Sequence, residues 1–100
     1  MKPAKLSRST RAQKKYQVVV DGRTIHFGAA GYEDYTTHKD PQRKARYLAR
    51  HSGEDWSDPT TAGFWARWLL WNKRTVAESI HDVSKRFNLR IKATPDVQSW

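Results

Sequence analysis

Hydrophobic positions are densest in the run TTAGFWARWLLW, residues 60–71, which holds three of the five tryptophans of the chain. On a helix these apolar side chains spread around most of the circumference, with Arg67 as the only strongly polar interruption. A helix that is apolar nearly all round is surrounded by other elements. The run therefore predicts a central core helix, with an exposed aromatic docking surface as the alternative. The residues of this core or docking surface are Phe64, Trp65, Trp68 and Trp71, and the terminal Trp100 is a further docking candidate.

An alternating segment earlier in the chain predicts a β-hairpin. Residues 16–20 alternate and are rich in β-branched side chains, and Asp21-Gly22 follows directly. An Asp-Gly pair is typical of a two-residue hairpin turn, because both of its residues must take positive φ. In the resulting register, His26 lies beside Gln17 on the face away from the core. The core face would consist of Tyr16, Val18, Val20, Ile25 and Phe27.

Capping signals predict further helices. Asp40-Pro41 combines an N-cap with a proline at the first helical position, and this helix should run to about His51. Thr75 and Glu78 form a capping box that begins an amphipathic helix. Residues 89–92 alternate and are a candidate third short strand. The predicted fold class is α+β, an N-terminal β-hairpin packed on about three helices with the Trp-rich helix at the centre.

The length of 100 residues predicts one domain with a modest core. Its first 14 residues carry five basic residues and no acidic one, and Leu6 is their only sizeable apolar side chain after Met1. Such a segment buries too little surface to offset its ordering entropy, so residues 1–14 are expected to be a flexible basic arm. The single α+β domain would then span residues 15–93, and residues 94–100 would form a C-terminal tail.

The net charge of +9 and the pI near 10.2 indicate an acidic partner. Charge alone leaves nucleic acid, an anionic membrane surface and an acidic protein open. The Trp-rich run is too short to span a bilayer and the N-terminus lacks the apolar region of a signal peptide, so we expect an intracellular protein without a membrane partner. The absence of cysteine excludes a disulfide framework, a thiolate nucleophile and a cysteine-based zinc site.

No catalytic, cofactor-binding or metal-binding residues are predicted. The four histidines show neither i, i+4 pairing on one helix nor an HExxH pattern. His38, Asp40 and nearby carboxylates lie close in sequence, as in a carboxylate–histidine nuclease, but no motif supports that chemistry. The serines lack a nucleophile elbow. We therefore expect a non-enzymatic protein without a cofactor or a small-molecule substrate.

Basic side chains point instead to a phosphate-binding surface without sequence readout. On the helix that begins at Pro41, Ala45 and Leu48 would face the core, while the arginines at i, i+3 and i+7 form one stripe. A solvated helix face is the alternative meaning of that stripe. Residues 85–86, 90 and 92 add a basic cluster near the C-terminus. The predicted binding residues are Lys2, Lys5, Arg8, Arg11, Lys14, Lys15, Arg43, Arg46, Arg50, Lys73 and Arg74.

Three sequence blocks resemble a small uncharacterised family found in large double-stranded DNA viruses and some phages. The blocks are TIHFGAAGYEDYTTHKD at residues 24–40, RKARYLARH at residues 43–51 and TAGFWARWLLWN at residues 61–72. The resemblance covers about residues 15–80 and leaves out the basic arm. That family carries no assigned activity, so the resemblance implies no catalytic residues. It implies a viral setting, within the particle, and otherwise the cytoplasm or nucleus of the host.

Two functional hypotheses follow. In the first, the protein is a virion structural component, a minor capsid or capsid-lining protein present in many copies. Its termini would thread between capsid proteins, and its basic arm and helix face would contact them, the packaged genome, or both. In the second, it is a sequence-nonspecific DNA-binding or DNA-condensing protein. The partners are accordingly capsid proteins, double-stranded DNA, or both.

Overall fold

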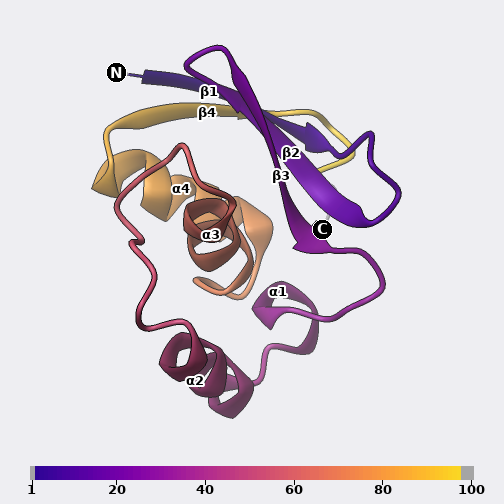
Figure 1. Cartoon of the computed structure of the whole chain (residues 1–100), viewed down its shortest axis with the longest axis vertical. Helices are drawn as coiled ribbons and strands as arrows, with labels where there is room; N and C mark the ends of the chain where they lie inside the picture. The colour runs from indigo at the N-terminus through magenta and orange to yellow at the C-terminus, as the bar shows by residue number, and fades with distance from the viewer. Residues whose placement is uncertain (1, 98–100) are drawn as a thin grey trace.

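A four-stranded mixed sheet in the order β3-β2-β1-β4 organises the fold (Figure 1), in a computed structural model that describes residues 2–97. Strands β1 and β2 and strands β2 and β3 pair antiparallel, whereas β4 lies parallel to β1. The predicted α+β class is confirmed. The strands are β1 (Lys2–Arg8), β2 (Lys14–Val20), β3 (Arg23–Ala29) and β4 (Leu89–Ala93). The helices are α1 (Tyr35–His38), α2 (Pro41–Arg50), α3 (Ala62–Trp65), the π-helix η1 (Ala66–Leu70) and α4 (Val76–Arg86).

The predicted hairpin is confirmed in its register. Strands β2 and β3 pair Tyr16 with Phe27, and the turn residues Asp21 and Gly22 take φ values of 53° and 72°. Positive φ at both turn positions matches the right-handed twist of the flanking strands. Gly28, near the end of β3, has a φ of 79°, and a Cβ there would lie 2.9 Å from Leu70. Only glycine therefore lets β3 approach η1 this closely.

The prediction that residues 1–14 form a flexible arm is wrong for residues 2–8. Residues 2–8 form β1, which lies between β2 and β4. Ala4 and Leu6 are 4% and 0% exposed, because alternation along the strand directs both of them into the core. Two neighbouring strands supply the backbone hydrogen bonds and buried surface that the segment lacks alone.

The C-terminal part of the chain also belongs to the sheet. Strand β4 forms at the predicted third strand, but it pairs with β1 rather than with the hairpin. Beyond it, the Thr94 N–H donates to the carbonyl of Leu6 over 3.0 Å, and Val97 is buried. The folded body therefore spans at least residues 2–97 rather than residues 15–93.

The Trp-rich run is helical but not one regular α-helix. Thr61 provides the N-cap, with its hydroxyl accepting the Phe64 N–H over 3.2 Å, so the helix begins at Ala62. From Ala66 the backbone widens into a π-helix, closed by the Trp71 N–H donating to the Ala66 carbonyl. A π-turn is rare and short. Apolar periodicity alone did not indicate it.

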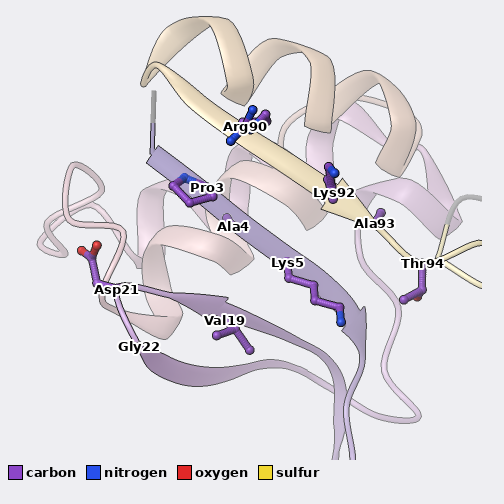
Figure 2. Close-up of a pocket in the computed structure, with 10 residues that line it drawn as sticks. All are labelled: Pro3, Ala4, Lys5, Val19, Asp21, Gly22, Arg90, Lys92, Ala93 and Thr94. Carbon is purple, nitrogen blue, oxygen red and sulfur yellow. The ribbon is translucent and has the colours of Figure 1, made fainter.

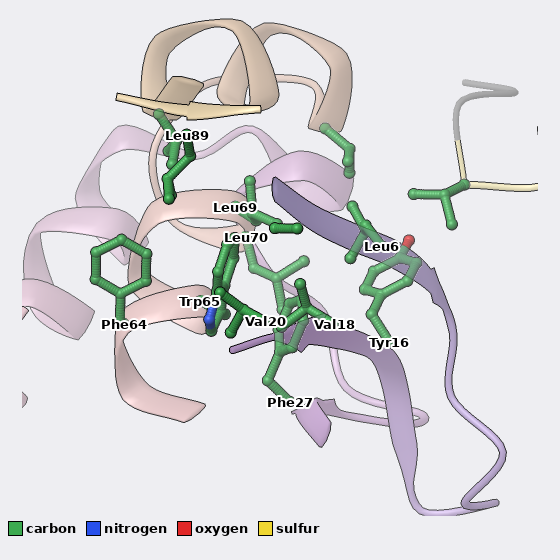
Figure 3. Packing of buried hydrophobic residues seen from close by; sticks show 14 residues of the cluster. Leu6, Tyr16, Val18, Val20, Phe27, Phe64, Trp65, Leu69, Leu70 and Leu89 are labelled. Atoms are coloured by element: carbon green, nitrogen blue, oxygen red, sulfur yellow. The ribbon is translucent and has the colours of Figure 1, made fainter. Parts of the chain in front are cut away.

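The hydrophobic core lies between the helices and one face of the sheet (Figure 3). Phe64 and Trp65 are fully buried, and Trp65 packs against Phe27 of β3 with ring centroids 6.4 Å apart. The Trp65 indole N–H donates to the carbonyl of Pro59 over 2.7 Å, which satisfies its buried polar atom. The core role predicted for this run is correct at these residues.

Helix α2 attaches to the body mainly through a residue that was not predicted, although the predicted Leu48 is half-buried. Asp40 and Pro41 begin the helix as expected, but Ala45 is exposed and Tyr47 is the buried residue. The Tyr47 ring stacks on Trp71 with centroids 4.3 Å apart and an interplanar angle of 3°. The aromatic partner of α2 is distant in sequence, so the helical pattern by itself could not identify the buried face. Within residues 2–97, no helix is long and apolar enough to cross a membrane.

We predict that Leu6→Ala lowers the free energy of unfolding by about 2–5 kcal/mol, because it leaves a cavity where a fully buried side chain packs. Urea unfolding followed by tryptophan fluorescence measures the change. The matched control is Lys5→Ala, whose side chain is exposed on the same strand and whose effect should stay within about 0.5 kcal/mol. Equal stability of Leu6→Ala and the wild type would show that the N-terminal segment does not pair in solution.

Candidate nucleic-acid interface

The helices cover one face of the sheet and leave the other bare (Figure 1). Since Ala4 and Leu6 face the core, Pro3 and Lys5 of β1 lie on the bare face. We call this bare side of the sheet the outer face. The sheet register then places Lys5 opposite Lys92 of β4 and opposite Val19 of β2.

Three cations from two separate parts of the chain meet on the outer face. Figure 2 shows Lys5, Arg90 and Lys92 on the same side of β1 and β4, with the helices behind the sheet. They border a shallow hollow of about 540 Å³. Pro3, Val19 and Ala93 provide apolar lining, and Gly22 brings the hairpin turn to its rim. The hollow thus combines cationic and small apolar side chains.

Like charges at Lys5 and Lys92 face each other across the parallel ladder. Like charges directly opposite on neighbouring strands destabilise a sheet. No salt bridge to Lys5, Arg90 or Lys92 is formed by the acidic residues in the described part of the chain. The nearest acid at the rim, Asp21, instead accepts from the Lys2 ammonium over 2.9 Å. An anionic ligand bound between these cations would offset this repulsion.

The outer face continues toward the connection between β1 and β2 as a polar surface. Gln17 lies opposite His26 as predicted, and the Ser9 hydroxyl lies 2.7 Å from Nδ1 of His26. Partial burial, and then the charges of Arg11 and Lys14, hold the pKa of His26 below its usual value. His26 is therefore mainly neutral at pH 7, chiefly because of burial, and the nearby Arg11 and Lys14 add to the lowering of its pKa.

The composition of the outer face differs from that of a single-strand binding platform. Its described positions on β1 and β2 are Pro3, Lys5, Ser7, Gln17 and Val19, none of them aromatic. Proteins that bind single-stranded nucleic acids combine a basic groove with aromatic side chains on which bases stack. The outer face offers cations and hydrogen-bonding groups without such a platform.

Several of the predicted binding residues are already paired with acids. Ion pairs join Lys2 to Asp21, Arg8 to Asp96, Lys15 to Asp34 and Arg43 to Glu33, with distances of 2.9, 3.5, 2.6 and 3.1 Å. The Lys15–Asp34 pair is largely buried, and Asp34 also caps α1. Charges paired in this way contribute less to attracting a polyanion than the exposed cations of the outer face.

The three arginines predicted to form a stripe on α2 differ in exposure and in ion pairing. Arg46 and Arg50 are exposed, whereas Arg43 is half-buried and held by Glu33. A cleft of about 540 Å³ brings Arg43 and Arg50 near Lys14 and Lys15 of β2. The structure therefore joins two predicted basic groups that are distant in sequence.

The remaining predicted residues lie away from the outer face. Lys73 and Arg74 are exposed in the turn between η1 and α4. Trp68 packs against Phe87 with centroids 5.2 Å apart, and the Arg67 and Arg86 guanidinium carbons lie 4.2 and 4.7 Å from its ring centroid. Trp71 is covered by Tyr47, and Trp100 lies outside the described residues.

From the sequence alone, the cations of β4 formed a separate C-terminal cluster, and their proximity to Lys5 was not predicted. The local signal for β1 was weak, because only Ala4 and Leu6 alternate as apolar positions within residues 2–8. The pairing of β1 with β4 could not be predicted from the sequence, because parallel strands are not connected by a tight turn that would mark the pair. Among residues 2–97, no group of three or more histidine or carboxylate side chains could hold a metal ion.

Comparison with known proteins adds a partial match. Residues 4–51 match a family model described as "Family of unknown function (DUF5754)". Neither the curated proteins nor the solved structures gave a match to this chain. This match confirms the resemblance to an uncharacterised family and does not bear on a viral or phage origin. The match begins within β1, so it includes most of the segment that we had placed outside the resemblance, and it ends before the Trp-rich run.

We predict that Arg11→Gln combined with Lys14→Gln raises the pKa of His26 toward, but not fully to, its ordinary value. Both cations oppose protonation of the imidazole, while burial remains the larger cause. An NMR titration of the histidine ring protons measures the shift, with Lys73→Gln and Arg74→Gln as the control of equal charge change. An unchanged His26 pKa would show that the positive potential at this end of the outer face is absent.

Proposed function

We propose that the protein is a non-enzymatic, sequence-nonspecific binder of double-stranded DNA whose main contact surface is the outer face of the sheet. The observation that carries the proposal is the meeting of Lys5, Arg90 and Lys92 on adjacent strands without acidic partners in the described chain. Binding to phosphates neutralises such cations and releases counterions from the duplex. Of the two hypotheses drawn from the sequence, this DNA-binding one gains the stronger structural support.

The composition of the outer face favours a duplex over a single strand. The face belongs to a four-stranded sheet in which β1 is an inner strand, so its cations would lie along the phosphate backbone rather than enter a groove. Single strands would require stacking aromatics.

The virion remains part of the proposal as the setting in which such binding would occur. It is supported by the resemblance to a viral family, and a protein lining a particle would meet the packaged genome in many copies. The threading role of the N-terminus loses its support, because residues 2–8 pair with two neighbouring strands. Contact with capsid proteins would therefore use the folded surface.

We predict that Lys5→Gln, Arg90→Gln and Lys92→Gln together weaken binding to unrelated double-stranded DNA at least about tenfold at 0.1 M salt. The slope of log affinity against log salt should fall by about 2.7, since each phosphate contact contributes about 0.9. Fluorescence anisotropy across a salt series measures both quantities.

The matched control replaces Lys73, Arg74 and Lys85 with glutamine, which removes the same three charges from exposed positions elsewhere. This control should keep most of the affinity and salt slope. Equal losses in the two triple variants would mean that binding follows net charge, and the outer face would lose its assigned role. Circular dichroism and the unfolding midpoint establish that each variant is folded.

A further inference from the structure

We infer that one molecule bridges two DNA duplexes, with the exposed side of helix α2 as a second contact surface. This inference rests on the proposed DNA binding by the outer face. The sheet and α2 lie at opposite ends of the longest axis of the molecule (Figure 1). That axis is 34 Å long, against 25 and 22 Å for the others.

The exposed side of α2 is suited to lie against a phosphate backbone. Its exposed positions include Ala45, Arg46, Ala49 and Arg50, and the helix contains no acidic residue. The small alanine side chains let the helix approach a ligand closely, while the two arginines extend beyond them. Arg46 and Arg50 are four residues apart, a spacing at which like charges repel. Neither forms a salt bridge with an acid in the described chain.

The contacts on the other side of α2 fix its orientation. The Lys44 ammonium donates to the carbonyl of Asn72 over 2.6 Å, and Tyr47 stacks on Trp71. Arg43 pairs with Glu33 over 3.1 Å. These contacts fix the orientation of the helix, so that Arg46 and Arg50 are exposed at fixed positions, with Arg50 at the edge of the cleft that it shares with Lys14 and Lys15.

An acidic connector lies along one side of the molecule, between α2 and α3. Residues 51–61 run from α2 to α3 (Figure 1) and contain Glu54, Asp55 and Asp58. Hydrogen bonds from Ser57 and Thr60 hold the pKa values of Asp55 and Asp58 below their usual range, so both are charged at neutral pH. A phosphate backbone would be repelled along this side.

The stiffness of DNA also prevents one duplex from serving both surfaces. DNA has a persistence length of about 150 base pairs, so a short duplex cannot fold back around so small a protein without a large bending energy. Each surface is therefore expected to hold its own duplex. Such an arrangement draws duplexes together and would condense DNA.

A two-duplex capture experiment tests the inference with the full chain. A biotinylated duplex of about 30 base pairs, too short to bend back, is bound to beads and loaded with protein. A fluorescent duplex of unrelated sequence is then added, and the retained fluorescence is measured. We expect the wild-type protein to retain the second duplex, in complexes that contain one protein and two duplexes by light scattering.

The deciding variant is Arg46→Gln combined with Arg50→Gln, with Lys73→Gln and Arg74→Gln as the control of equal charge change. The α2 variant should keep its affinity for the first duplex within about threefold and lose capture of the second at least about tenfold. The control should capture as the wild type does. Undiminished capture by the α2 variant, or complexes with two proteins per two duplexes, would overturn the inference.

The outcomes also separate this inference from the function on which it rests. A wild-type protein that binds the first duplex but never retains the second would refute bridging and leave DNA binding in place. A protein that does not bind the first duplex at all would refute the proposed function itself, and bridging with it.

Discussion

The insertion of β1 between β2 and β4 is the constraint on which the rest of the structure depends. It buries Leu6 completely and Ala4 almost completely, and β1 is the strand with which β4 pairs within residues 2–97. Without β1 the sheet would reduce to a two-stranded hairpin, which is marginally stable in water. The same insertion brings Lys5 beside Lys92, so the contact that completes the core also creates the cationic outer face.

The Trp-rich helix explains why the sheet keeps one bare face. Phe64, Trp65, Leu69 and Leu70 are all buried against the inner side, and the π-turn lets the consecutive leucines both face the core. The uncovered side carries polar and cationic residues, which suit contact with water or with a charged ligand.

The distribution of charge matters more than its total. Six acidic residues lie between Glu33 and Asp58, and several hold neighbouring cations or cap helices. The outer face and the exposed side of α2 have no such partners in the described chain. The net charge of +9 is therefore concentrated at separate surfaces, and this separation is the basis for proposing DNA binding and duplex bridging.

The sequence by itself determined the elements whose signals are local. The Asp-Gly turn set the hairpin register, capping residues began α2 and α4, and apolar density marked Phe64 and Trp65 as core. Only the tertiary structure decided what non-local contacts control. The apolar surface of Leu6 is too small to predict a strand from the sequence, and it becomes buried only because two neighbouring strands cover it. Tyr47 rather than Ala45 faces inward because Trp71 offers it a stacking partner. The meeting of Lys5 with Arg90 and Lys92 likewise required a parallel ladder between the two ends of the chain, which no local pattern encodes.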